Sequence, residues 1–308
     1  MKPARKVPMA WREVNGILLL DKPAGASSNQ ILQTVRRLFG AEKAGHTGSL
    51  DPLATGLLPI CFGEATKIAG QLLGSHKAYS TTAMLGQTRS TDDSEGEVLV
   101  ERSLPPINDD LIRRGLAMLT GELTQVPPIY SAIKRDGERM YKRARRGEVV
   151  DVPPRQVEVH RFDLIATHLP TLDLEIECGS GTYVRSLVRD LGEFLGCGAH
   201  VTALRRLWVE PFRDPAMLTL KQLETLAASG ESALDATLLP LESGLSHFPQ
   251  CRVKAEDELR LRQGQGIDVE LPQGFCVVVA ADSGRAIALA DSDGKGRVRP
   301  TRGFSAAS

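Results

Sequence analysis

One segment of the chain joins a carboxylate to the backbone restrictions that suit a catalytic residue. Asp51 lies in the run GHTGSLDPLATG at 45–56, which is rich in Gly, Thr and Pro and shows no helical or strand period. Pro52 disfavours the helical region for the residue before it, so we expect Asp51 to be extended or in a turn. A carboxylate held in a rigid loop suits a nucleophile or a general base. An Asp before Pro is also a common turn residue, so the residue types alone leave both interpretations open.

The elements that must position this segment follow from apolar spacing and from capping residues. An apolar strand is expected at 15–20, and after a turn Ser27 or Ser28 caps a helix that Gly40 closes. Further expected strands are 78–86, 157–165 and 172–178, and further helices begin at Asn108, at Thr182 and at Thr219, the last with Gln222 in a capping box. The residues 87–96 read as a polar loop. Strands and helices mix without a regular alternation, which favours an α+β fold.

The pattern changes around residues 244–249. A charged helix is expected at 255–263, and glycine-punctuated strands follow at 275–281 and 286–290. We therefore expect a small, separate β-rich module of about 60 residues at the C-terminal end.

Composition excludes several classes of protein. The 308 residues are 42% hydrophobic and 25% charged, with 38 basic and 38 acidic side chains, so the chain is neither a polycation nor an acidic tail protein. No apolar run approaches the ~18 residues of a membrane span, and no apolar region of a signal peptide follows the basic N-terminus. The five cysteines include no C-x-x-C pair, so we expect reduced thiols in the cytoplasm and no metal site.

A neutral chain can still carry a local basic surface. Residues 134–146 hold seven basic and two acidic side chains, with Tyr130 and Tyr141 beside or among them. Such a run is most often a solvated helix face. The interleaved tyrosines favour contact with RNA.

Several segments, in order, resemble the TruB family of pseudouridine synthases, bacterial enzymes that isomerise uridine 55 in the tRNA T loop. The run at 45–56 resembles the family's motif II, which continues through LLPICFGEATK at 57–67, and GILLLDKPAGASS at 16–28 resembles motif I. Later matches are KAY at 77–79, CGSGTYVR at 178–185, LG at 191–192 and GCGAHVTALRR at 196–206. The resemblance covers roughly residues 15 to 240.

The resemblance implies roles for individual residues. Asp51 matches the catalytic aspartate, Tyr79 the tyrosine that packs on the target base, and Arg185 the arginine that pairs with the carboxylate. An adjacent arginine favours the ionised carboxylate, so we expect Arg185 to lower the pKa of Asp51. Substrate contacts are implied for His46, which meets the T loop, for Tyr183 and Leu204 in the base pocket, and for Lys22, which supports the site or the RNA.

The resemblance also implies the organisation of the chain. A basic tail at 1–14 precedes a catalytic domain at 15–245, built on a mixed, largely antiparallel sheet with flanking helices, and a small PUA-like RNA-binding domain follows at 250–308. The basic stretch matches an insertion at about 127–148 that closes over RNA, with Arg143, Arg145 and Arg146 as expected phosphate contacts. The expected partner is the tRNA T stem-loop. No cofactor, metal, membrane or obligate protein partner is implied, and a cytoplasmic monomer is expected.

The implied reaction breaks the bond from C1′ to N1 and rejoins the base through C5, after the nucleotide is flipped into a pocket. A carboxylate either attacks C1′ or removes the 2′ proton, and the sequence leaves both routes open. Two other functions also remain: an RNA-binding or tRNA-folding factor, and a guide-RNA-dependent synthase subunit. The loop at 89–96 keeps Thr91, Asp93 and Gly96 of the family's pattern Thr-Asp-Thr-x-Asp-x-x-Gly but differs at its first two positions, which leaves the role of the loop at 87–96 open.

Overall fold

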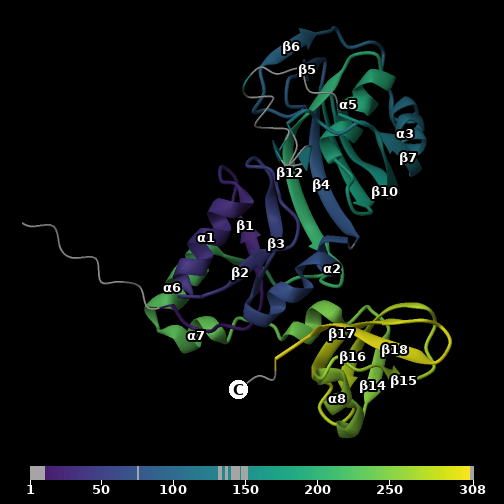
Figure 1. Cartoon of the computed structure of the whole chain (residues 1–308). Coiled ribbons are helices and arrows are strands. Elements are labelled where there is room, and N and C mark those ends of the chain that lie inside the picture. The colour runs from purple at the N-terminus through teal and green to yellow at the C-terminus, as the bar shows by residue number, and fades with distance from the viewer. Residues whose placement is uncertain are drawn as a thin grey trace, which may run out of the picture.

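The computed structural model describes residues 11–74, 76–130, 134–135, 138–139, 146 and 152–305. Within this part of the chain, a nine-stranded sheet forms one part of the molecule and a five-stranded sheet forms the other (Figure 1). The loop that carries Asp51 connects two strands of the larger sheet.

The larger sheet is mixed and mostly antiparallel. Its strands in spatial order are β13 (Leu218–Thr219), β1 (Gly16–Lys22), β3 (Thr55–Phe62), β12 (Ala199–Val209), β4 (Lys77–Leu85), β11 (Thr171–Cys178), β10 (Arg155–His168) and β7 (Gly121–Gln125), with β2 (Ala44–His46) beside β3. Only the pairs β1–β13 and β3–β12 are parallel among these described strands. The expected α+β fold with a largely antiparallel sheet is therefore confirmed.

Helices cover this sheet through apolar faces. The helices and 3-10 segments of this part are α1 (Ser28–Leu38), η1 (Gly63–Ile68), α2 (Ala69–Gly74), α3 (Asp109–Met118), α5 (Val184–Phe194), α6 (Leu220–Ala228), α7 (Glu231–Asp235) and η2 (Leu241–Leu245). Ser27 caps α1 in a capping box with Gln30, and Asn108 and Thr219 cap α3 and α6. These three caps confirm the predicted helix starts. None of the described helices is long and apolar enough to span a membrane.

The five-stranded sheet packs on both its faces. Its order is β14 (Gln250–Val253), β16 (Gly274–Ala280), β17 (Ala286–Ser292), β18 (Arg297–Gly303) and β15 (Ile267–Asp268). One face forms an apolar cluster with Leu261 of α8 (Ala255–Arg262). The other face joins a cluster that also contains Ile17 and Leu57 of the larger sheet. The two sheets thus share a continuous apolar contact.

Several strands were not predicted from the sequence, including β7, β14 and β18. The longest is β12, because adjacent Arg205 and Arg206 interrupt its apolar alternation. The structure accommodates both: Arg205 forms a bidentate pair with Asp21, at 2.9 Å for each bond, and Arg206 is buried against backbone carbonyls. Also not predicted were β2, which overlaps the start of the segment without a period, and the hairpin of β5 (Gln87–Arg89) with β6 (Val98–Glu101).

A second small hairpin pairs β8 (Lys134–Arg135) with β9 (Glu138–Arg139). It lies in the expected RNA-closing insertion, most of which falls outside the described residues. The neighbouring strands β7 and β10 pair antiparallel on either side of this segment in the chain.

Candidate active site

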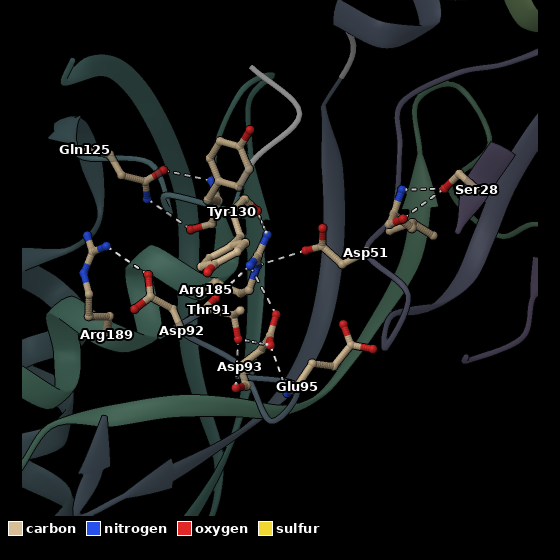
Figure 2. Close-up of polar contacts among 12 residues, drawn as sticks. Ser28, Asp51, Thr91, Asp92, Asp93, Glu95, Gln125, Tyr130, Arg185 and Arg189 are labelled. Carbon is tan, nitrogen blue, oxygen red and sulfur yellow. Dashed lines mark hydrogen bonds and ion pairs between the residues drawn. The ribbon is translucent and has the colours of Figure 1, made fainter. Parts of the chain in front are cut away.

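Asp51 lies in a loop, residues 47–54, that joins β2 to β3 and is held through its backbone. Three buried side chains, which we call the loop clamp, provide the contacts: Lys22, Ser28 and Arg206. The Ser28 hydroxyl accepts a hydrogen bond from the Leu50 N–H at 2.7 Å and donates to the Leu50 carbonyl at 3.0 Å (Figure 2). The residue before Asp51 is therefore fixed at both its peptide groups.

Lys22 holds the other side of the loop. Its side chain is 0% exposed, and Nζ donates to the carbonyl oxygens of Ala54 at 2.7 Å, Pro23 at 2.9 Å and Pro52 at 3.3 Å. Withdrawal from solvent lowers the pKa of Lys22 to about 8, while nearby Asp51 acts in the opposite direction. The ammonium therefore faces the Pro23 carbonyl and two loop carbonyls that follow Asp51. Of the two roles expected for Lys22, these contacts are of the kind that supports the site, and contact with RNA stays a prediction.

Arg206 fixes the two ends of the loop. Its Nε donates to the Leu57 carbonyl at 2.7 Å and its Nη2 to the Gly48 carbonyl at 3.1 Å, in a side chain that is 1% exposed. Strands β3 and β12 approach closely here: a Cβ at Gly56, where φ is +94°, would lie 2.2 Å from the Arg206 carbonyl oxygen. Glycine is therefore required at position 56 for the loop to meet Arg206.

The carboxylate of Asp51 meets an arginine that is shared with a second acid. Arg185, in the first turn of α5, places Nε 2.9 Å from Asp51 Oδ2 and Nη1 3.2 Å from Asp93 Oδ2 (Figure 2). The same guanidinium donates to the carbonyls of Thr91 at 2.7 Å and Tyr130 at 3.1 Å. Arg185 is 4% exposed, so its orientation is set by these four acceptors.

The loop between β5 and β6 delivers Asp93 to this arginine. Asp93 is 2% exposed and its Oδ1 accepts from the Thr91 hydroxyl at 2.5 Å and from the Glu95 N–H at 3.1 Å. Asp92 adopts a left-handed conformation, with φ at +59°, and turns its carboxylate to Arg189 at 3.0 Å. The loop therefore holds Arg185 through a second carboxylate, which faces a different guanidinium nitrogen from the one that faces Asp51.

The surroundings of Asp51 raise its pKa, although Arg185 is adjacent. Burial raises the pKa of Asp51 above its ordinary value, and the nearby Asp93 raises it further. Arg185 and Lys22 lower it, but by less than burial and Asp93 together raise it. Arg185 thus lowers this pKa as expected, but the net shift is upward, because the arginine comes with a second carboxylate and a partly desolvated site. The Asp51 side chain itself keeps 36% of its surface exposed.

A cavity of about 280 Å³ opens beside this pair. Tyr79 of β4 and Leu204 of β12 form its apolar wall, and both are buried, at 9% and 7% exposed. Burial raises the pKa of the Tyr79 phenol, so it is protonated near neutral pH. Tyr183, just before α5, lines the same cavity, and its peptide N–H and carbonyl bind the side-chain amide of Gln125 at 2.8 and 3.1 Å. Asp51, Arg185, Tyr79, Tyr183 and Leu204 thus meet in one cavity.

The family models agree with this arrangement. Residues 36–184 match the N-terminal domain of TruB family pseudouridylate synthases, and residues 185–246 match the C-terminal domain of tRNA pseudouridylate synthase B. The chain belongs to the TruB family.

Relatives within the TruB family are similar over almost their whole length. The tRNA pseudouridine synthase B of Xanthomonas campestris (strain 8004) is 54% identical over 299 residues, which is 96% of each chain. That of Pseudomonas aeruginosa is 48% identical over 293 residues, 94% of this chain and 96% of its own.

Solved structures share the fold at lower identity. An H/ACA RNP bound to a substrate RNA containing 2′-deoxyuridine matches with a TM-score of 0.74 at 20% identity, over 99% of this chain and 93% of the other. An archaeal box H/ACA sRNP complex matches at 0.72, with 21% identity over 99% and 92%. This similarity of fold covers 99% of the chain and so includes the five-stranded sheet.

The remaining residues expected from the TruB resemblance lie elsewhere. His46 is partly exposed at the end of β2 and does not line the cavity. Arg146 is exposed in a turn, while Arg143 and Arg145 lie outside the described residues. In the described part of the chain, no group of three or more His, Cys, Asp or Glu side chains could hold a metal ion.

Sequence reasoning missed the roles of several TruB-family residues in this site. Asp93 had a signal, since it is one of the three positions that keep the family's loop pattern. Ser28, Arg206 and Gln125 had none beyond their presence in or near matched segments, because their partners are backbone groups that are distant in sequence.

Proposed function

We propose that this chain isomerises uridine 55 in the T loop of tRNA to pseudouridine. The observation that carries the proposal is the ion pair of Asp51 with Arg185 beside a cavity that has an aromatic and an aliphatic wall. A flipped pyrimidine needs such a wall for stacking, and the sugar bond needs a fixed carboxylate. Relatives at about half identity are named tRNA pseudouridine synthase B.

Asp51 is the catalytic group of this proposal. Because the sugar becomes electron-deficient when the bond from C1′ to N1 breaks, an adjacent carboxylate stabilises the change by attack on C1′ or by removal of the 2′ proton. The backbone of the loop is held on both sides of Asp51, so the carboxylate reaches C1′ without rearrangement of the loop. Arg185 keeps the carboxylate oriented through the 2.9 Å contact.

The cavity wall holds the base while it turns. Tyr79 stacks on the detached uracil and Leu204 extends the same apolar wall, so that C5 replaces N1 at the sugar without loss of the base to solvent. Tyr183 narrows the entrance, and His46 contacts the rearranged T loop outside the cavity.

We further propose that RNA is held by two other regions. The expected insertion at about 127–148 contacts phosphates through Arg143, Arg145 and Arg146, and the C-terminal sheet, within an expected PUA-like domain at 250–308, contacts the tRNA away from the T loop. Catalysis needs no cofactor, and the protein acts as a monomer in the cytoplasm.

A purified-protein assay tests the function directly. Unmodified tRNA transcript is incubated with the protein alone, and pseudouridine is mapped at single-nucleotide resolution. Pseudouridine at position 55 is expected with no guide RNA present. Modification that appears only with a guide RNA contradicts a stand-alone enzyme. Binding and refolding of tRNA without any modification contradicts the reaction and supports a folding factor.

A further inference from the structure

Arg155 is a cationic side chain of the cavity that the proposed chemistry leaves unused. It is the first residue of β10 and the direct neighbour of Gln125 on β7. Its guanidinium carbon lies 4.5 Å from the centre of the Tyr183 ring, and the side chain lines the same cavity as Asp51. We call Arg155 and Tyr183 the cavity mouth.

One edge of the Arg155 guanidinium has no acceptor. Among the residues that the structure describes, neither Nε nor Nη2 has a hydrogen-bond partner, although both atoms are shielded from solvent. An unmet buried donor costs about 1–3 kcal/mol, and more when it is charged. Buried donors of this kind are rare in native proteins and need a specific explanation. Stacking on Tyr183 fixes the plane of the guanidinium but satisfies none of its N–H groups.

The other cations of the cavity are occupied. Lys77 donates to the Leu73 carbonyl at 3.0 Å, Arg185 is bound by two acids and two carbonyls, and Arg206 by two carbonyls. The one carboxylate that lines the cavity, within the described residues, is Asp51, and it faces Arg185. The cavity therefore has an excess of positive charge. Arg185 Nε also lacks a hydrogen bond, but it lies 2.9 Å from the Asp51 carboxylate, whereas Nε and Nη2 of Arg155 face no acceptor among the described residues.

The two unmet atoms define what would bind. Nε and Nη2 lie on the same edge of the guanidinium, so their N–H groups are parallel and match two oxygens of one phosphate or carboxylate. A single carbonyl oxygen of the base would satisfy one of the two donors only.

We propose that Arg155 binds, through this edge, the phosphodiester adjacent to the nucleotide whose base enters the cavity. The inference rests on the proposed function, which supplies an RNA substrate. The contact anchors the backbone at the cavity mouth while the base reaches Asp51 further in. Arg155 is then a substrate-binding residue that acts on affinity more than on the chemical step.

The test pairs a change in the protein with a change in the RNA. Binding of a T stem-loop RNA is measured for the Asp51→Asn protein, so that turnover does not interfere, with and without Arg155→Gln. A second RNA carries a neutral methylphosphonate in place of the phosphate on either side of the target uridine. We expect Arg155→Gln to weaken binding of the unmodified RNA about tenfold, as for removal of a charge-assisted bidentate interaction, and to lower the log–log salt slope by ~0.7–0.9.

The methylphosphonate gives the decisive comparison. At one of the two positions it should weaken binding to the parent protein about as much as the Arg155→Gln change does, and have little further effect on Arg155→Gln. Arg155→Lys should recover part of the affinity, because it restores the charge but not the fork. Arg114→Gln is the matched control, since Arg114 is an exposed arginine of α3 that does not line the cavity.

Two results overturn the assignment: affinity of Arg155→Gln equal to that of the parent, or a methylphosphonate penalty that is the same in both proteins. If Arg155→Gln does not fold, as judged by thermal unfolding, the same comparison with Arg155→Lys decides. Failure of the proposed function has a different signature, namely absence of pseudouridine in the tRNA assay with unaltered protein. The binding result does not depend on that assay.

Discussion

The loop clamp and the cavity mouth bracket the same cavity but differ in how their polar atoms are satisfied. In the clamp, Lys22, Ser28 and Arg206 are at most 3% exposed and donate to carbonyls of the Asp51 loop or of residues next to it. In the mouth, Arg155 is fixed by stacking on Tyr183 but has an edge without acceptors in the described structure. The first region is complete without RNA, and the second is not.

This difference separates two tasks in one site. The carboxylate must be in place before the base arrives, because a misplacement of about 1 Å costs on the order of 100-fold in rate. Phosphate contacts can instead form on binding, since their energy comes from the RNA itself. We therefore expect changes in the clamp to alter stability or rate, and changes at the mouth to alter affinity and salt dependence.

The largest effect is expected from the group that the clamp presents. Asp51→Asn removes the negative charge needed for attack on C1′ or for removal of the 2′ proton, while its amide keeps the size of the side chain. Turnover should fall by about 10⁴-fold or more, and tRNA affinity should change little. Single-turnover rates and equilibrium binding measure the two effects separately. Turnover at even a tenth of the unaltered rate would remove Asp51 from the mechanism.

The clamp itself is tested by Lys22→Met. The methionine fills a similar volume but leaves the carbonyls of Pro23, Pro52 and Ala54 without this donor. Because each unmet buried acceptor costs about 1–3 kcal/mol, the free energy of unfolding should fall by about 3 kcal/mol or more. Denaturant unfolding gives the value.

The matched control for the clamp is Lys43→Met, since Lys43 is an exposed lysine. It should change the free energy of unfolding by less than about 0.5 kcal/mol. Equal effects of the two substitutions would mean that Lys22 does not hold the loop.

The pH dependence of the rate tests the charge around Asp51. Either route needs the carboxylate, so the rate should fall as pH falls through the pKa of Asp51, which lies above its ordinary value. Asp93→Asn removes a negative charge that raises this pKa and leaves Arg185 to Asp51 alone. Both effects lower the pKa of Asp51, so the acid limb should move to lower pH.

Asp92→Asn is the control for this shift. It also removes one negative charge from the loop, but Asp92 pairs with Arg189, and asparagine tolerates its left-handed backbone. The acid limb should stay where it is. An acid limb that moves equally in both variants, or in neither, contradicts the coupling of Asp93 to Asp51.

The sequence predicted those residues of the site that belong to short, recognisable segments of the chain. Asp51, Tyr79 and Arg185 belong to segments that resemble family motifs, and Ser27 and Asn108 cap helices where expected. The strand β12 was missed because a buried arginine looks like a surface residue until its acceptors are known. The sign of the pKa shift at Asp51 depends on burial, which apolar spacing does not give for a loop.

Arg155 is a second residue whose role a single sequence does not predict. No motif marks it, and its importance comes from the absence of acceptors, among the described residues, around a guanidinium that a strand and a ring hold in place. Contacts between side chains and distant backbone groups, whether made or missing, are therefore the main part of the site that a single sequence does not predict.

The smallest expected effect concerns the basic stretch at 134–146. Arg143, Arg145 and Arg146 changed together to Ala should weaken tRNA binding and lower the log–log salt slope by ~0.7–0.9 for each phosphate that is no longer neutralised. The rate at saturating tRNA should fall far less than for Asp51→Asn, because these side chains do not act on the sugar.

A triple change of Arg37, Arg113 and Arg114, exposed arginines of α1 and α3, alters the net charge equally and serves as the control. It separates local phosphate contacts from general attraction, which depends on net charge and is screened by salt. If both triple variants flatten the salt dependence alike, the stretch acts only through long-range charge. If neither variant changes the salt dependence, the basic stretch makes no phosphate contact. Arg155 is then the one proposed phosphate contact that remains.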